Sequence, residues 1–430
     1  MTRSEVAPAR RAAYEVLRRV FEHDAWADRA FPAAAERHGL DSRERGQAQR
    51  LAYGAVQRRG TTDRLVAELA ERPVARLDPP VLAALRLGMY ELLFSDATPA
   101  HAAVDQAVEL AKGEGGRRRR AGASLVNAVL RRAATAGDLL AGLDDGTPEG
   151  AAARHSYPDW LARMWWSELG PDDARSLMAA MNGPAETALR VNTLKADAQA
   201  LIEELLASGE PIATGGEGLL WPPEAIVVEG PLSEAIRDRI AAGELVSQAR
   251  GSQAVVATLD PRPGERILDL CAAPGVKTTA LAARMGDRGE VVAVDRDSGR
   301  AGQLGELCKR LGATCVRVVV GDAAETDLGG GYDRVLVDPP CSDLGTLASR
   351  PDARWRKSPE LIERVAAIQS AILDHAVETL KPGGTLVYSV CTISRREGPD
   401  QVDPLHPRSM QVRPDRDRTD GFFIAGLERA

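Results

Sequence analysis

The stretch RILDLCAAPGVKTTALAARMG, Arg266–Gly286, predicts the fold of the second half of the chain. An apolar run ends at Leu270 and is followed by a turn of small residues and then by a helical pattern. Four more β-branched runs alternate with helical segments further along, at residues 290–295, 315–322, 333–338 and 384–390. Strands that alternate with helices in this way favour a doubly wound parallel sheet of the Rossmann-like α/β class. We therefore expect such a domain over residues 246–430.

The residues before this sheet predict two further domains. Residues 1–134 carry apolar stripes at helical spacing, as in DSRERGQAQRLAYGAV (41–56) and DPPVLAALRLGMYELLF (78–94), and predict an all-α domain. Residues 135–156 are rich in Gly, Ala and Asp, which indicates a linker. Residues 157–245 mix helical patterns with short apolar runs, which is typical of a small α+β domain.

Composition excludes several classes of protein. No run of about 18 apolar residues exists and the first residues lack a secretion signal, so we expect neither a membrane span nor export. The five cysteines have no zinc-type spacing, which predicts free thiols, no metal site and a reducing, cytoplasmic compartment. Residues 1–134 hold 23 Lys and Arg against 17 Asp and Glu, whereas the rest holds 32 against 45. This asymmetry indicates that the N-terminal domain contacts nucleic acid.

Small and acidic residues at the predicted strand ends indicate a mononucleoside cofactor. Ligands of a doubly wound sheet bind beyond the carboxyl ends of its strands. The small residues of the first turn let backbone approach a ligand, and the N–H groups that open the next helix can bind a carboxylate. Asp295 and Asp322 end the next two strands, where they can bind ribose hydroxyls and an adenine amine. S-adenosylmethionine fits this arrangement, and the absence of Gly-x-Gly-x-x-Gly and P-loop motifs disfavours dinucleotides and nucleotide hydrolysis.

Two cysteines follow the ends of the last two predicted strands. Cys341 follows the fourth strand directly after Asp338-Pro-Pro, and Cys391 follows the fifth. These strands are neighbours in the usual order of the fold, so both thiols should face one crevice. A role as a small buried hydrophobe suits Cys308 and Cys315 better than this pair.

The pair has a chemical rationale in pyrimidine methylation. A thiolate that adds to carbon 6 makes carbon 5 nucleophilic enough to accept a methyl group. An acid must balance the charge that develops at ring N3, and Asp338 is placed to do so. A second cysteine can assist release of the product.

At these residues the sequence resembles the RNA cytosine-5 methyltransferases, specifically the RsmB (Sun) family that acts on 16S rRNA. The stretches that carry the resemblance are LRVNTLK, DLCAAPGVKT, VVAVDRD, GDA, DPPCSDLGTLASRPDARWRKSPE, YSVCTIS and TDGFFIAGL. PAHAAVDQAVELAK and SLVNAVLRR resemble parts of the NusB-like RNA-binding domain of that family. The resemblance implies methylation of carbon 5 of one cytosine, cytosine 967 in the family's usual rRNA counting, through a covalent Cys–C6 adduct.

The resemblance also implies roles for individual residues. Cys391 is then the nucleophile, Cys341 assists release and Asp338 contacts N3. The implied cofactor-binding residues are Cys271, Ala272, Ala273, Pro274, Gly275, Val276, Lys277, Asp295, Asp322 and Asp338.

We expect RNA as the partner, most simply 16S rRNA. We also expect the enzyme to be a monomer. The target base must be single-stranded or flipped out of its helix. Arg117, Arg118, Arg119 and Arg120 are candidate phosphate contacts, although such a run is also typical of a solvated loop.

Two alternatives remain open. The substrate could be tRNA or another RNA, against which the N-terminal helical domain argues. The chain could also be an RNA-binding assembly factor with a decayed active site, since Val276 and Ala249 replace the family's usual Gly and Asp. The retained Cys341, Cys391 and Asp338 argue against decay.

Overall fold

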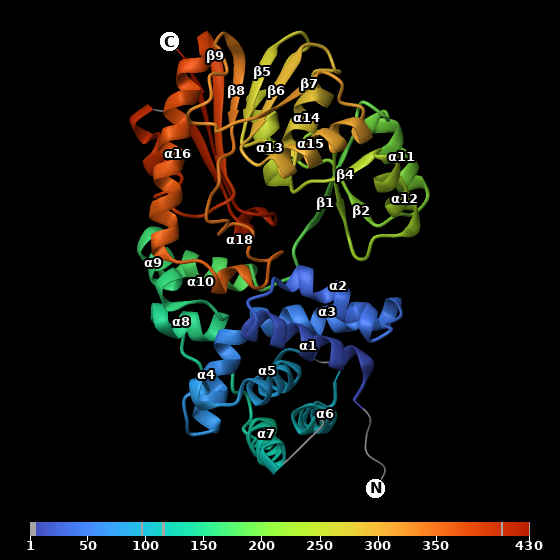
Figure 1. Cartoon of the computed structure of the whole chain (residues 1–430), viewed down its shortest axis with the longest axis vertical. Helices are drawn as coiled ribbons and strands as arrows, with labels where there is room; N and C mark the ends of the chain where they lie inside the picture. The colour runs from blue at the N-terminus through green and yellow to red at the C-terminus, as the bar shows by residue number, and fades with distance from the viewer. Residues whose placement is uncertain (1–5, 96–97, 114–116, 406, 430) are drawn as a thin grey trace. The chain divides into compact units, whose positions relative to one another are not determined.

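The computed structural model describes residues 6–95, 98–113, 117–405 and 407–429. The chain divides into two compact units (Figure 1). Unit 1 consists of Met1–Gly183 together with Leu347–Lys357, and unit 2 consists of Pro184–Thr346 and Ser358–Ala430. Residues 347–357 therefore interrupt the sequence of unit 2 but belong to unit 1.

Unit 1 is all-helical in its described residues. Its α-helices are α1 (Pro8–Glu22), α2 (Ala27–Arg37), α3 (Ser42–Gln57), α4 (Arg59–Leu69), α5 (Pro79–Phe94), α6 (Ala100–Lys112), α7 (Arg117–Thr135), α8 (Pro148–His155), α9 (Asp159–Leu169) and α10 (Pro171–Ala180). Two short 3-10 helices are η1 (Val74–Arg76) and η2 (Ala353–Trp355).

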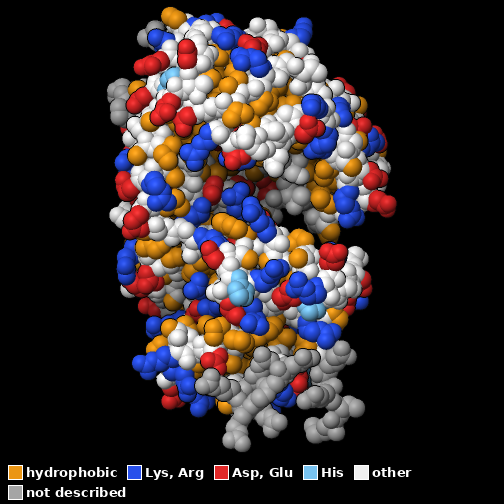
Figure 2. All heavy atoms as spheres, in the orientation of Figure 1, with side chains coloured by type: hydrophobic (Ala, Val, Ile, Leu, Met, Phe, Trp, Pro, Cys, Tyr) orange, Lys and Arg blue, Asp and Glu red, His pale blue; other side chains and the backbone are white. Residues whose placement is uncertain are grey.

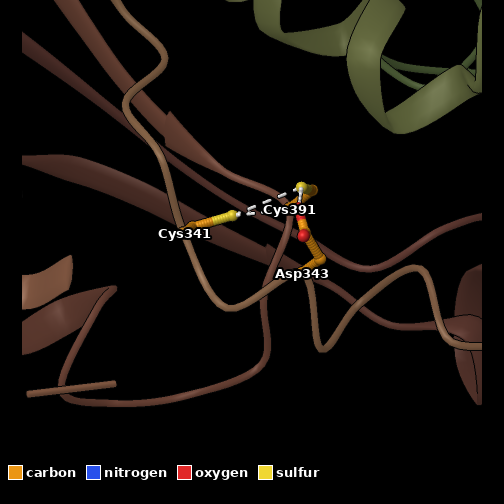
Figure 3. Close-up of side chains that lie close together, drawn as sticks. All are labelled: Cys341, Asp343 and Cys391. Carbon is orange, nitrogen blue, oxygen red and sulfur yellow. Dashed lines mark hydrogen bonds between the residues drawn. The ribbon is translucent and has the colours of Figure 1, made fainter. Parts of the chain in front are cut away.

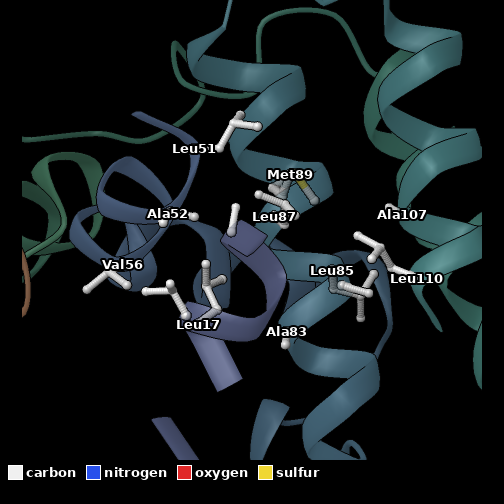
Figure 4. Packing of buried hydrophobic residues seen from close by; sticks show 14 of the residues in the cluster. Leu17, Leu51, Ala52, Val56, Ala83, Leu85, Leu87, Met89, Ala107 and Leu110 are labelled. Atoms are coloured by element: carbon white, nitrogen blue, oxygen red, sulfur yellow. The ribbon is translucent and has the colours of Figure 1, made fainter. Parts of the chain in front are cut away.

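Local sequence explains why these helices begin and pack as they do. The side chain of Asp41 accepts from the backbone N–H of Glu44, and the side chain of Glu44 accepts from the backbone N–H of Asp41, which caps α3. Helix α5 starts with two prolines, whose missing N–H groups cost nothing in a first turn. The apolar stripes of α1, α3, α5, α6 and α7 form one core (Figure 4). The predicted all-α domain is confirmed.

The segment Leu347–Lys357 is fastened to unit 1 by three consecutive side chains. Arg354 is fully buried, donates to the backbone oxygen of Ser156 at 3.1 Å and to Oδ1 of Asn182 at 2.8 Å, and lies 4.0 Å from the ring centroid of Tyr157. Trp355 donates from Nε1 to the backbone oxygen of Val56 at 2.8 Å. Arg356 donates to backbone oxygens of the turn before α2.

Unit 2 contains a small antiparallel sheet and a larger mixed one. The small sheet has the order β2-β3-β1-β4, formed by β1 (Thr187–Val191), β2 (Ile212–Ala213), β3 (Ala225–Val228) and β4 (Leu245–Ser247). It packs with α11 (Ala198–Ala207) and α12 (Glu234–Ala242) around its own apolar core. The predicted α+β pattern is therefore present.

The large sheet has the order β10-β11-β9-β8-β5-β6-β7. Its strands are β5 (Arg266–Leu270), β6 (Glu290–Asp295), β7 (Val316–Val320), β8 (Tyr332–Val337), β9 (Leu380–Val390), β10 (Arg408–Val412) and β11 (Phe422–Glu428). The five predicted strands are parallel, as expected. The expectation of a wholly parallel sheet is wrong, because β10 and β11 extend it as antiparallel strands beside β9.

Alternate strand residues feed two cores, one on each face of the sheet. Leu268, Val292 and Val335 point to the face that carries α16 (Pro359–Thr379). Ile267, Val291 and Leu336 point to the opposite face, which carries α13 (Arg250–Leu259) and α14 (Val276–Arg284). Helix α15 (Ser298–Leu311) packs beside α14 (Figure 1). The remaining short helices are α17 (Pro399–Val402), η3 (Asp403–Leu405) and α18 (Pro414–Asp417). Helices on both faces make this a doubly wound sheet.

The predicted boundaries at residues 134, 156 and 245 concern separate folding domains and stay predictions. The compact units divide the chain differently, because the predicted linker contains α8 and residues 157–183 group with the N-terminal helices. Among the described residues, no helix is both long and apolar enough to cross a membrane.

Candidate functional site

The order of strands changes direction between β5 and β8, which lie side by side. Ligands of doubly wound folds bind at this point, beyond the carboxyl ends of the strands. Cys271 follows β5, and the charges of Asp338, Asp295, Asp269 and Asp322 all act on its thiol. Burial, followed by these carboxylates, raises the pKa of Cys271 to about 12, so this thiol stays protonated. The acidic residues predicted from separate strand ends therefore lie close enough to Cys271 to act on its thiol.

The turn after β5 keeps its backbone close to the strands beside it. Cys271 and Gly275 both have positive φ, 62° and 101°, and a Cβ on Gly275 would lie 3.0 Å from the side chain of Leu304. Ala272 and Ala273 are buried. The N–H groups that open α14 follow directly at Val276. Small side chains and a helix N-terminus thus follow the carboxyl end of β5, as predicted.

Asp295 and Asp322, which are predicted to bind the cofactor, also accept hydrogen bonds from backbone N–H groups. Asp295 is buried and accepts from the backbone N–H of Ala273 at 3.2 Å and of Asp297 at 3.0 Å. Asp322 accepts from the backbone N–H of Ala324 at 2.9 Å. Each carboxylate oxygen can accept a second hydrogen bond, so these contacts leave room for a nucleoside hydroxyl or amine.

Asp338 is held at the end of β8 by two neighbours. Lys277 donates from Nζ to Oδ2 of Asp338 at 2.7 Å, and Ser389 of β9 donates to Oδ1 at 2.9 Å. Burial acts to lower the pKa of Lys277, but the charge of Asp338 and its hydrogen bond outweigh burial and raise it. Cys391 contributes to that rise, which places its sulfur within the field of the ammonium group.

The two predicted thiols lie side by side (Figure 3). Their Sγ atoms are 3.4 Å apart, and they come from the ends of the neighbouring strands β8 and β9. The expectation that these strands are adjacent is confirmed. The hydrogen bond to Cys391, then burial, then the charges of Cys391, Asp343 and Glu397 raise the pKa of Cys341 well above its usual range. Cys308, in contrast, is buried among apolar side chains, as predicted.

Asp343 lies beside both thiols and was not expected in the site. Its Oδ1 is 3.3 Å from Sγ of Cys391 and 3.6 Å from Sγ of Cys341 (Figure 3). The residue has a φ of 56°, a conformation that Asp tolerates better than most residues. An acidic residue two positions after Cys341 was the only sequence signal, and nothing local says where its side chain points.

Glu397 is a second residue that the sequence did not reveal. It is fully buried and its Oε1 accepts from the backbone N–H of Ser342 at 2.8 Å and from Nε2 of Gln369 at 3.2 Å. Its Oε2 accepts from the hydroxyls of Ser342 and, at 3.4 Å, of Thr392. Burial raises the pKa of Glu397, although the bonds from Ser342 oppose that rise. This carboxylate joins the residue after Cys341 to the residue after Cys391.

Three family models match consecutive parts of the chain. The NusB family matches residues 7–135, a ferredoxin-like domain of RsmF/B-like methyltransferases matches residues 157–233, and 16S rRNA methyltransferase RsmB/F matches residues 256–413. A probable ribosomal RNA small subunit methyltransferase B of Synechocystis sp. is 33% identical, over 98% of this chain and 99% of its own. The chain belongs to the RsmB/F family of 16S rRNA methyltransferases.

Other members of the RsmB/F family are similar over their full length. A probable methyltransferase B of Bacillus subtilis is 30% identical over 97% of this chain and 98% of its own, and that of Vibrio cholerae is 31% identical over 98% and 97%. The crystal structure of PH0851 covers both chains completely with a TM-score of 0.79 and 26% identity. A methyltransferase homolog protein from Pyrococcus horikoshii has a TM-score of 0.59 and 26% identity, over 66% of this chain and 99% of its own. These matches confirm the predicted family and three-part fold.

Membership of the RsmB/F family makes the chain an S-adenosylmethionine-dependent RNA methyltransferase. The residues at these strand ends fit this cofactor, because a turn of small residues adjoins a helix N-terminus and carboxylates follow at the next two strand ends. The individual cofactor-binding residues stay predictions.

The predicted RNA contacts Arg117, Arg118, Arg119 and Arg120 form the first turn of α7, but their side chains lie outside the described residues. On the face drawn in Figure 2, described Lys and Arg side chains are interspersed with Asp and Glu side chains. The phosphate-binding surface therefore stays a prediction.

Proposed function

We propose that the chain methylates carbon 5 of a cytosine in 16S rRNA, cytosine 967 in the family's usual counting, through a covalent adduct between Cys391 and carbon 6. The observation that carries the proposal is the 3.4 Å separation of the Cys341 and Cys391 sulfurs, with Asp338 held by Ser389, two residues before Cys391. An enzyme that methylates an exposed amine needs neither thiol. Carbon 5 of cytosine becomes nucleophilic only after a thiolate has added to carbon 6.

The surroundings of the two sulfurs support different roles for them. Cys391 stands at the position that the family resemblance implies for the nucleophile, and its side chain lies near enough to Lys277 to interact with the ammonium group. Cys341 has a raised pKa beside Cys391, Asp343 and Glu397 and stays a thiol. We therefore assign Cys391 as the nucleophile and Cys341 as the group that assists release.

The reaction balances as follows in terms of bonds. The thiolate Sγ of Cys391 bonds to carbon 6, and the electron pair of the carbon 5–carbon 6 double bond moves into the ring towards N3, which takes a proton from the hydrogen-bonded Asp338–Lys277 pair. Bound S-adenosylmethionine supplies the methyl group. A base then takes the proton from carbon 5, the electron pair of that C–H bond restores the carbon 5–carbon 6 double bond, and the sulfur–carbon bond breaks so that Cys391 leaves as a thiolate. Cys341, as a thiol, assists that release by donating a proton to the leaving sulfur.

The cofactor would be held by residues from three strand ends. Cys271, Ala272, Ala273, Pro274, Gly275, Val276 and Lys277 would bind its amino-acid end through small side chains and helix N–H groups. Asp295 would accept from the ribose hydroxyls and Asp322 from the adenine amine. We propose that the enzyme acts as a monomer in the cytoplasm.

The test uses labelled S-adenosylmethionine with naked 16S rRNA, assembled small subunits and tRNA. Cys391→Ala should abolish methyl transfer, whereas Cys341→Ala should leave protein trapped on RNA as a denaturation-resistant complex. Cys308→Ala is the matched control, because Cys308 lies in an apolar cluster apart from the thiol pair.

Several outcomes would contradict the proposal. Activity in Cys391→Ala, or a product other than 5-methylcytosine, refutes the mechanism. Methylation of tRNA in preference to rRNA supports the alternative substrate. Failure of the folded chain to bind S-adenosylmethionine in calorimetry supports a decayed assembly factor.

A further inference from the structure

Two thiol sulfurs and one carboxylate oxygen, all common metal ligands, lie close together beyond the carboxyl ends of β8 and β9. They are Sγ of Cys341, Sγ of Cys391 and a carboxylate oxygen of Asp343, and all lie within 4.8 Å of one another. Figure 3 shows the three side chains pointing towards a common space. The sequence predicts no metal site because no two cysteines have zinc-type spacing, but this cluster joins residues about 50 positions apart.

The separations match those between ligands of a tetrahedral zinc ion. With zinc–sulfur bonds of about 2.3 Å and zinc–oxygen bonds of about 2.0 Å, tetrahedral ligands lie about 3.8 Å apart for two sulfurs and about 3.5 Å apart for sulfur and oxygen. The observed distances are 3.4 Å between the sulfurs and 3.3 and 3.6 Å from the sulfurs to Oδ1 of Asp343. Adjustments of a few tenths of an ångström bring all three atoms into bonding distance of one ion.

Hydrogen bonds hold the two segments that carry Cys341, Asp343 and Cys391 in position. The backbone N–H of Gly345 donates to the backbone oxygen of Cys391 at 3.0 Å, which ties the two segments together. The buried carboxylate of Glu397 holds Ser342, the residue between Cys341 and Asp343. When the ligands of a metal site are already in position, metal binding carries no further entropic cost of ordering them.

We propose that Cys341, Cys391 and Asp343 bind a thiophilic divalent cation of the zinc class, and that the bound metal and cytosine exclude each other. Two sulfur ligands favour zinc-class ions over magnesium and calcium, which prefer oxygen. Three protein ligands leave a fourth position open to water.

The binding step balances without a change in oxidation state. Each thiol loses one proton, and each sulfur donates one lone pair to the metal. The ion then occupies the space beside the sulfur of Cys391 and withdraws electron density from it, so carbon 6 of cytosine cannot reach and accept that sulfur. The exclusion rests on the proposed function, whereas metal binding does not.

The experiment uses the reduced, metal-free full chain with cobalt(II) as a spectroscopic probe. A thiolate-to-cobalt charge-transfer band should appear at one equivalent, disappear when zinc is added, and be absent in Cys341→Ser and Cys391→Ser. Zinc should release about two protons per ion in weak buffer near neutral pH. Asp343→Ala should weaken binding by about tenfold or more, and Cys308→Ser should leave the band unchanged.

Methyl transfer is measured on the same samples. Stoichiometric zinc should inhibit the enzyme, and a chelator should restore its activity. Should a serine variant fail to fold, alkylation of the wild-type chain replaces it, with zinc expected to protect Cys341 and Cys391 from iodoacetamide.

The outcomes separate the two proposals. Absence of the band, its persistence in Cys391→Ser, or alkylation that zinc does not slow overturns the metal site. Full methyl transfer at saturating zinc overturns the exclusion. Activity of Cys391→Ala without zinc would refute the proposed nucleophile and leave the band as the independent measure of metal binding.

Discussion

The buried carboxylate of Glu397 accepts a hydrogen bond from the backbone N–H of Ser342 at 2.8 Å, and so joins the segments that carry the two thiols. Glu397→Ala would leave the Ser342 amide, the Ser342 hydroxyl and Gln369 without this acceptor. We expect a loss of about 1–3 kcal/mol in the free energy of unfolding, measured with urea, because buried donors would be unsatisfied. We also expect kcat for methyl transfer to fall more than KM changes.

Glu397→Gln is the matched control for this network. It keeps an acceptor oxygen and the side-chain volume, so part of the lost kcat should return. An alanine variant with wild-type kcat would show that Glu397 does not position the thiols.

Lys277 and Asp338 form an ion pair whose disruption should affect both stability and activity. Their side chains are only 14% and 27% exposed, so Lys277→Met would leave Asp338 as a largely buried charge without its partner. We expect a loss of about 2–4 kcal/mol in the free energy of unfolding and a severe loss of methyl transfer. The double variant Lys277→Met/Asp338→Leu should regain stability but no activity. A double variant no more stable than the single one would contradict this account.

Asp269 should make stability depend on pH. It is 1% exposed, and burial raises its pKa to about 7, opposed by the hydrogen bond from Thr278 and helped by the charge of Asp338. A raised carboxyl pKa stabilises the folded chain below the unfolded value, near 3.9, and that stability is lost as pH rises through 7.

Asp269→Asn removes this titration, so the free energy of unfolding of the variant should rise relative to that of the wild type as pH increases. Between pH 5 and pH 8 the gain in the free energy of unfolding should reach about 2–3 kcal/mol. Urea unfolding of both chains across that range checks it. Parallel curves would show that Asp269 does not titrate in the folded state.

Arg354 should be the residue that holds the segment Leu347–Lys357 to unit 1. Arg354→Ala would leave its carbonyl and amide acceptors without a donor and remove its contact with Tyr157. We expect a loss of about 3 kcal/mol in the free energy of unfolding of unit 1. Arg131→Ala is the control, because Arg131 is an exposed residue of unit 1 and its loss should change stability by about 0.5 kcal/mol or less. Equal effects of the two variants would contradict the assignment.

The arginine run should account for part of the salt dependence of RNA binding. Replacing Arg117, Arg118, Arg119 and Arg120 with Gln should reduce the slope of log affinity against log salt by up to about 3, because fewer counterions would be released. Filter binding of 16S rRNA fragments at several salt concentrations measures the slope. An unchanged slope would remove these residues from the RNA-binding surface.

Local patterns determined the elements that recur or are strongly periodic. The helices of residues 1–134 and the five parallel strands follow from spacing of apolar residues, and the turn at Cys271–Gly275 follows from its small side chains. Strands β10 and β11 were not predicted. Most side chains of β10 are exposed, so it lacks an alternating apolar pattern, and β11 depends on pairing with β9 for its place.

The sequence by itself determined the fold class, the family and the two thiols with Asp338 as candidates, because these depend on local periodicity and short motifs. Only the tertiary structure decided that Cys341 and Cys391 lie 3.4 Å apart, with Asp343 in contact with Cys391 and Glu397 bonded to Ser342. It also decided that Leu347–Lys357 belongs to unit 1. These relations join residues far apart in the chain. They depend on strand register and side-chain rotamers, which the packing of the whole unit selects and no local pattern encodes.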